Sequence, residues 1–331
     1  MGSYRIEQGA VHLGDVKLTV PDSVSPEARG YLSAHPWGEE AQNAPRIPMW
    51  LTRDAVDPAF RMLNEMALQI WPCDVEDTEV AGVHCHRIKP TNASPALAER
   101  IMINLHGGGF VIGSGALGEA IPIAGETGVE VVAVDYRLAP EHPFPAAIDD
   151  VVAVYRALLD EGYKPGNIVL FGTSAGGFLT AMSIMRFKRD GLPLPCCCGV
   201  FTAGGDVVNL GDTFNYLTLS GFYGHIGHEF SDPECERAVF LGGANPDDPL
   251  VAPIKGDLSD FPPTLLVSGT RDAVLSSAAM FHRALRKAGR EAELYVFEAM
   301  PHAHWYAYHL PEAREAIDIM ARFFERHLRI G

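Results

Sequence analysis

The sequence has no long hydrophobic run and few positive charges for its length. No stretch approaches the roughly 18 apolar residues that a bilayer-crossing helix needs, so no membrane span is expected. The opening MGSYRIEQGAVHLGDVKL lacks the cationic start and apolar stretch of a signal peptide, which predicts a cytoplasmic protein. Lys and Arg total 26 against 42 Asp and Glu, and the net charge is −16. This acidic balance opposes binding to phosphate backbones, so we expect no nucleic acid partner.

Cysteine is also scarce, with six residues in a chain of 331, and without a signal peptide this number does not predict a disulfide framework. Three cysteines are adjacent at 196–198. In a strand their side chains would alternate between two faces, so we interpret them as small apolar residues of a core strand. The pairs His84/His86 and His302/His304 have the character of metal ligands, but no third ligand stands near either pair, so no metal site is expected.

The first 75 residues differ from the rest of the chain. They contain scattered prolines, helical patterns at 26–34 and 57–70, and no good strand. Asp57 and Pro58 have the character of start signals for the second helix. We interpret residues 1–75 as an appendage that packs over the main unit, residues 76–331.

From Val80 onward, short apolar runs typical of strands alternate with helical patterns, which predicts an α/β fold with a mostly parallel sheet and helices on both faces. The rhythm pauses at 209–241, a segment rich in Gly, Tyr, Phe and His that we interpret as an insertion above the sheet. The expected strands lie within 80–88, 100–106, 129–136, 167–172, 196–204, 264–269 and 292–298, and the expected helices span 146–161, 175–189, 277–288 and 311–328.

Functional sites in such sheets form at the carboxyl ends of the strands, and one expected strand runs directly into the sequence GTSAGG at 172–177. Glycines two positions before and after Ser174 allow a strand and a helix to approach closely around a tight turn, which exposes the serine hydroxyl. The helix that follows would direct its first N–H groups at a developing negative charge. Ser174 is therefore a candidate nucleophile, although G-x-S-x-G alone also fits an ordinary glycine-rich turn.

A second expected strand ends in HGGGF at 106–110. Its glycines let the backbone approach a substrate and turn N–H groups inward. The spacing matches neither the dinucleotide-binding nor the P-loop pattern. Together with the N–H of Ala175, the N–H groups of this loop would form an oxyanion hole beside Ser174.

A serine hydrolase also needs an acid and a histidine, and on this fold they follow the nucleophile in that order. Asp272 follows the expected strand TLLVSG. Beyond it, His282 and His327 lie in helical patterns that suit the surface. His302 and His304 both follow the last expected strand, and position alone leaves the choice between them open.

At this point the sequence resembles the hormone-sensitive-lipase-like (bacterial type IV) esterases of the α/β-hydrolase superfamily, from about Val80 to the C-terminus. The motif GTSAGG, with Thr173 where many members of the family have an acidic residue, is similar to that of one of the two main subgroups. The resemblance rests on HGGGF at 106–110, DYRLAPEHPFPAAIDD at 135–150, GTSAGG at 172–177, GTRDAVLS at 269–276 and MPHAHW at 300–305.

The resemblance implies an α/β-hydrolase fold whose helical cap fits residues 1–75, with further cap material at 209–241. It implies a serine carboxylesterase that hydrolyses short- to medium-chain acyl esters without a cofactor, and it implies a homodimer. Because members place the base after a Met-Pro-like dipeptide, the resemblance favours His302, although His304 departs from the aromatic residue usual at its position. The implied site consists of Ser174 as nucleophile, Asp272 as acid, His302 as base, and Gly107, Gly108 and Ala175 as oxyanion donors.

Two other functions use the same residues. Lactone or amide (formamide) hydrolysis is an alternative, because the fold and triad do not fix the leaving group. A non-catalytic ligand receptor would be expected to lack a triad member or an intact oxyanion loop, and neither is missing here. The aromatic residues of the two cap segments suggest an apolar acyl site, although core packing is the more common role for any one of them. These residues are Trp37, Trp50, Trp71, Tyr216, Phe222 and Tyr223.

Overall fold

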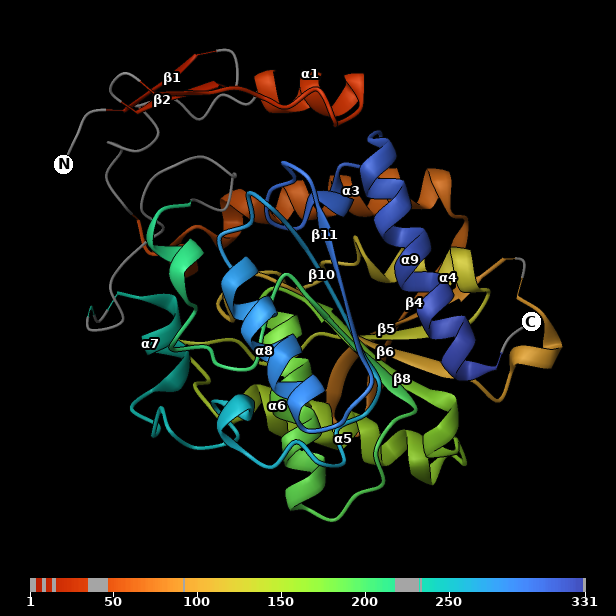
Figure 1. Ribbon diagram of the computed structural model, residues 1–331. Helices are drawn as coiled ribbons and strands as arrows, with labels where there is room; N and C mark the ends of the chain where they lie inside the picture. The colour runs from red at the N-terminus through yellow and green to blue at the C-terminus, as the bar shows by residue number, and fades with distance from the viewer. Residues whose placement is uncertain are drawn as a thin grey trace.

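The fold is built around one large mixed sheet. The computed structural model describes residues 4–7, 10–13, 16–34, 47–91, 93–217, 232 and 234–329. Within them, eight strands form a sheet in the order β11-β10-β9-β8-β6-β7-β5-β4 (Figure 1). The strands from β11 to β7 run parallel, and β5 and β4 extend the sheet as an antiparallel hairpin. Their bounds are β4 Cys73–Val80, β5 Val83–Pro90, β6 Ile101–Leu105, β7 Glu130–Val134, β8 Ile168–Thr173, β9 Cys197–Phe201, β10 Thr264–Gly269 and β11 Ala292–Phe297.

Helices cover both faces of this sheet, as the alternation of patterns predicts. The core on one face includes side chains of α5, α6 and α8, and the core on the other includes side chains of α3, α4 and α9 (Figure 1). The central strands β6, β8, β9 and β10 are buried along their whole length, which explains their continuous apolar sequences. The helices span α3 Arg53–Ile70, α4 Ala120–Thr127, α5 Ala146–Asp160, α6 Ala175–Arg189, α7 Glu236–Leu241, α8 Leu275–Lys287 and α9 Pro311–Leu328.

The cysteine run lies where the sequence predicts, in a core strand. Cys197 and Cys198 are buried in β9, Cys196 is half-buried just before it, and all three are free thiols. Among the described residues, no helix is both long and apolar enough to cross a membrane.

The expectation of no strand in the first 75 residues is wrong. Three short strands, β1 Tyr4–Glu7, β2 Ala10–Leu13 and β3 Val16–Leu18, form a separate antiparallel sheet, and β4 begins at Cys73. Strands of three or four residues are too short to show a recognisable alternation of apolar and polar residues. β4, CDVEDTEV, forms the edge of the main sheet and is mostly exposed and acidic, so it has no apolar pattern.

Both expected N-terminal helices are present, and one is longer than expected. Helix α1, Pro26–Ala34, packs on α9, where the Ser25 N–H and hydroxyl donate to the Glu312 carboxylate. Helix α3 begins at Arg53 rather than at Asp57, so that Pro58 lies inside the helix. The Arg53 side chain donates to the carbonyl oxygens of Val111 and Ala139 in the main unit, contacts that the local sequence does not reveal. Of the expected insertion at 209–241, residues 218–231 and 233 lie outside the described residues, as does Trp37.

Candidate active site

Ser174 lies at the turn between β8 and α6, in the middle of the sheet. Its backbone has φ 57° and ψ −120°, a strained conformation that is typical of a serine raised on a nucleophile turn. The two flanking glycines are required for close packing: a Cβ on Gly172 or on Gly176 would overlap the carbonyl oxygen of Leu105 in the adjacent strand β6. The glycine spacing in the sequence thus has a direct steric reason.

His302 and Asp272 meet Ser174 at the carboxyl end of the sheet. The distance from the Ser174 Oγ to the His302 Nε2 is 2.9 Å, and the distance from the His302 Nδ1 to the Asp272 Oδ1 is 2.8 Å. Asp272 follows β10 and His302 follows β11. The loops after β8, β10 and β11 all lie at the carboxyl ends of the strands, so they bring together residues that are far apart in the chain. With a proton on Nδ1, the imidazole donates to Asp272 and presents a lone pair to the serine hydroxyl.

The environment of Asp272 favours its charged form. Burial alone would raise the pKa of this completely buried carboxyl, but His302 and the hydroxyls of Ser268 and Thr202 hold the pKa below its ordinary value. The Ser268 Oγ donates to Oδ2 at 2.6 Å, and the Thr202 hydroxyl donates to the same oxygen. A carboxylate that stays ionised beside the ring can stabilise an imidazolium.

The HGGG loop lies directly against Ser174. A Cβ built on Gly107 would be 3.5 Å from the Ser174 Cβ, and one on Gly108, at φ 114°, would collide with the Ile112 carbonyl group. Among the described residues, the N–H groups of Gly107 and Gly108 donate to no other backbone group. The Ala175 N–H is at the first turn of α6 and has no intrahelical acceptor. These three N–H groups are thus available for a negatively charged oxygen beside Ser174.

A cavity of about 240 Å³ opens over Ser174 and His302, with Gly107, Gly108 and Ala175 in its wall. The rest of its lining is mostly apolar, and part of it comes from the two segments expected to form a cap. The cap residues used below are Met49, Phe60, Leu63, Leu210 and Phe214.

The aromatic residues singled out from the sequence are not the ones that line this cavity. Trp50, Trp71 and Tyr216 do not contribute, and Trp71 instead packs in the core, 5.3 Å from the ring of Tyr308. Phe222 and Tyr223 lie outside the described residues. Identifying the lining aromatics requires the tertiary packing of α3 and of the loop after β9.

His304 occupies a different environment from His302. Its ring is buried between Phe297 and Trp305, at centroid distances of 4.8 and 5.2 Å, and burial lowers its pKa to about 4. A ring in this environment is neutral and takes part in aromatic packing, so His304 fills the place of the aromatic residue that the resemblance leads us to expect.

The sequence analysis does not identify a buried carboxyl group next to Thr173, the residue before Ser174. The Glu119 carboxyl accepts hydrogen bonds from the Asn104 Nδ2, at 2.6 Å, and from the hydroxyl of Thr173. Burial raises the pKa of Glu119 to about 7. It belongs to no motif, and the only sequence signal is a lone acidic residue within the apolar stretch GALGEAIPIAG.

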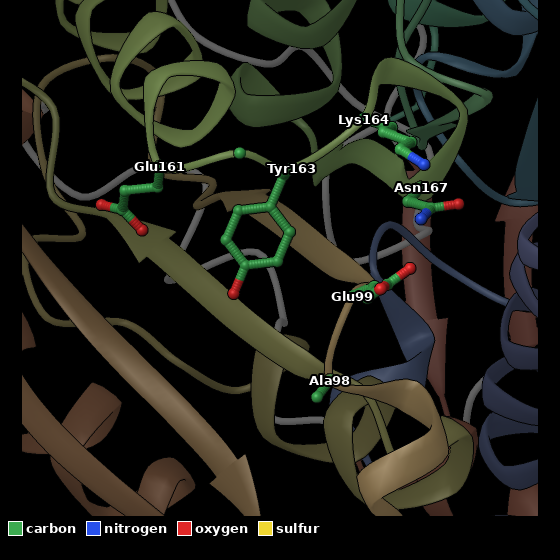
Figure 2. A pocket seen from close by; sticks show the side chains of 7 residues that line it. Ala98, Glu99, Glu161, Tyr163, Lys164 and Asn167 are labelled. Atoms are coloured by element: carbon green, nitrogen blue, oxygen red, sulfur yellow. The ribbon is translucent and has the colours of Figure 1, made fainter.

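A second cavity of about 460 Å³ lies at the opposite ends of the strands, their amino ends (Figure 2). Glu99 and Asn167, in its wall, precede β6 and β8, so the cavity is at the amino ends of these strands. Glu161, Tyr163 and Lys164 come from the turn after α5. Because the residues of the candidate triad lie at the carboxyl ends, this larger cavity is separate from them.

A family model, related sequences and solved structures all place the chain in the same family. A family model described as alpha/beta hydrolase fold matches residues 102–306. The chain is similar to an acetyl-hydrolase of Streptomyces hygroscopicus, with 33% identity over 68% of this chain and 75% of that protein. It is also similar to an esterase of Acinetobacter venetianus, with 28% identity over 82% of this chain and 89% of that protein.

Among solved structures, esterase E25 superposes with a TM-score of 0.82 and 30% identity, covering 96% of this chain and 98% of that chain. An esterase from the bacterial hormone-sensitive lipase family gives a TM-score of 0.73 and 32% identity, covering 87% and 95%. The chain therefore belongs to the α/β-hydrolase family, among the hormone-sensitive-lipase-like esterases, and is a carboxylic ester hydrolase.

Proposed function

We propose that the chain is a serine carboxylesterase that hydrolyses short- to medium-chain acyl esters through an acyl-enzyme intermediate. The observation that carries the proposal is the continuous hydrogen-bonded chain from Ser174 through His302 to Asp272, which lies at the base of an apolar cavity. An apolar cavity with a few convergent polar groups suits an acyl chain attached to a reacting carbonyl group.

In the proposed mechanism, the Ser174 Oγ attacks the ester carbonyl carbon while the His302 Nε2 accepts the hydroxyl proton. The carbonyl oxygen becomes an oxyanion, which accepts hydrogen bonds from the N–H groups of Gly107, Gly108 and Ala175. His302 then gives its proton to the leaving alkoxide. Water attacks the acyl-enzyme with His302 again as the base, and Ser174 is released with its proton restored.

Residues 1–75 and the insertion at 209–241 serve as the cap in this proposal. Met49, Phe60 and Leu63 come from the first segment, and Leu210 and Phe214 come from the second. A volume of about 240 Å³ is below the roughly 300 Å³ at which pockets for drug-sized ligands begin, so acyl groups at the short end of the range fit best. The names acetyl-hydrolase and ethyl acetate hydrolase among the relatives agree with a small acyl group.

The test is hydrolysis of p-nitrophenyl esters from acetate to palmitate by the wild type and by Ser174→Ala. We expect turnover to peak at short to medium chains, and kcat to fall by about 10⁶ in the variant while the fold is retained. No turnover of any ester by a folded wild type would overturn the proposal, and lactones and formamides would then be the next substrates to assay.

A further inference from the structure

Two histidines on strand β5 face the same side of the β4–β5 hairpin as an aspartate. His84 and His86 are two residues apart and so share one face of the strand. Asp77 of β4 pairs with His86 in the antiparallel register. The sequence offers no third ligand for the His84/His86 pair, but this cross-strand register supplies one.

The three side chains come close enough together to surround an ion. One ligand atom from each of Asp77, His84 and His86 lies within 4.8 Å of the others. In a tetrahedral site with Zn–N distances of about 2.0–2.1 Å, ligand atoms are about 3.3 Å apart. Asp77 and His84 have 77% and 52% of their side chains exposed, so small side-chain rotations can close the remaining gap.

A carboxylate outside the cluster, that of Asp135, orients one of the two imidazoles. The His86 Nδ1 lies 2.6 Å from the Asp77 Oδ1, and the His84 Nδ1 lies 3.0 Å from the Oδ2 of Asp135, which follows β7. Carboxylates beside the rings are the usual means by which proteins orient histidine ligands and increase their basicity. The His86 Nδ1 already faces the Asp77 Oδ1, so these two atoms are placed to act as ligands of one ion.

We propose that Asp77, His84 and His86 form a binding site for a divalent transition-metal ion such as Zn²⁺. Two imidazole nitrogens and one carboxylate oxygen suit Zn²⁺, whereas Mg²⁺ and Ca²⁺ prefer oxygen ligands. The negative charges of Asp77 and Asp135 favour a cation at this position. An open cavity of about 360 Å³, with Asp77, His86 and Ser114 in its wall, gives the ion a path from solvent. The site is separate from Ser174 and takes no part in the proposed ester hydrolysis.

The test is a calorimetric titration of EDTA-treated, full-length protein with Zn²⁺. We expect one equivalent to bind to the wild type, and His84→Ala and His86→Ala each to weaken binding by at least about tenfold. Asp77→Asn, which keeps the size of the side chain and removes its charge, is expected to weaken binding by a similar factor.

His142→Ala is the matched control, because His142 is an exposed histidine that does not belong to this cluster. Its Zn²⁺ affinity should equal that of the wild type. Ester turnover measured without metal should be unchanged in all four variants, which shows that they are folded. The proposal is overturned if the wild type binds no Zn²⁺, or if any of the three hairpin variants retains the wild-type affinity.

Discussion

Asp272 is a buried carboxylate whose charge depends on several donors. His302, Ser268, Thr202 and the N–H of Val274 all hydrogen-bond to its two oxygens. Hydroxyl groups can rotate to suit a new partner, so this environment tolerates an amide in place of the carboxylate.

We therefore expect Asp272→Asn to fold and to lose about 10⁴ in kcat, because the amide no longer favours the His302 tautomer that accepts the serine proton. Steady-state kinetics on a short p-nitrophenyl ester measures the loss, and circular dichroism checks the fold. His304→Phe is the control and should keep near wild-type activity, because His304 lies among aromatic rings. Loss of activity in His304→Phe, with activity retained in His302→Ala, would refute the assignment of the base.

Glu119 gives the protein a pH-dependent stability. Its pKa of about 7 in the folded state lies above the ordinary value of 4.5, so between these values the folded state holds more protons than the unfolded state. Stability therefore decreases as pH rises from 4.5 through 7, and the loss is complete above pH 7.

Glu119→Gln imitates the protonated acid and should remove this decrease. The variant should gain stability relative to the wild type as pH rises, by up to about 3 kcal/mol at pH 8 compared with pH 4.5. Urea unfolding of both proteins at pH 5 and pH 8 measures the effect, and the wild type serves as the reference for all other titrating groups. If the free energies of unfolding of the two proteins differ by the same amount at both pH values, the prediction is wrong.

Helix α3 connects the N-terminal segment to the catalytic unit through Arg53. Its guanidinium donates to the carbonyl oxygens of Val111 and Ala139, both at 2.7 Å, and forms a two-pronged pair with Glu141 at 2.9 Å. Val111 directly follows HGGGF, and α3 also carries Phe60 and Leu63 into the cavity. Arg53 thereby fixes one wall of the cavity relative to the HGGG loop.

Arg53→Ala should raise KM severalfold and lower kcat less, because the cavity wall loosens while the triad remains intact. It should also lower the free energy of unfolding by about 2 kcal/mol, as expected for lost charged hydrogen bonds. Michaelis–Menten kinetics and urea unfolding test both effects. Arg61→Ala, an exposed change further along the same helix, should alter neither, and an equal change in both variants would argue against a specific role for Arg53.

The sequence predicts elements well where they are buried and poorly where they are exposed. Strands such as β8 and β10 are continuous apolar runs because both faces are covered. β4 has no such run because it is an exposed edge. Helix α4, Ala120–Thr127, is almost entirely buried, so its polar face, on which helical periodicity depends, is absent.

The candidate site was predictable to the extent that motifs encode backbone geometry. Glycines around Ser174 and in the HGGG loop are sterically required, so their spacing is informative. Glu119 is different, since its role depends on contacts with Asn104 of β6 and Thr173 of β8. A local pattern cannot report such contacts, and the same limit hid the pairing of Asp77 with His86.

The molecule as a whole has a cavity at the carboxyl ends of the strands and another at their amino ends. We expect only the cavity at the carboxyl ends, over Ser174, to determine the substrate. Phe214 lines the cavity over Ser174, and Tyr163 lines the cavity at the amino ends of the strands (Figure 2). Phe214→Ala enlarges the first cavity and should shift the preferred acyl chain to a greater length.

Relative kcat/KM across the p-nitrophenyl ester series measures this shift. Tyr163→Ala is the matched aromatic truncation in the cavity at the amino ends and should leave the chain-length profile unchanged. A shifted chain-length profile in Tyr163→Ala, with no shift in Phe214→Ala, would contradict this prediction, because the acyl group would then bind in the cavity lined by Tyr163.

The order of the loops along the chain also affects when activity can begin. Ser174 follows the central strand β8, but His302 follows β11, the last strand to be synthesised and the outermost on its side. A chain that ends before residue 302 contains Ser174 and the HGGG loop, yet it lacks the residue proposed as the base. In the proposed mechanism, hydrolysis therefore requires the loop after the final strand, and we expect chains that end before this loop to be inactive.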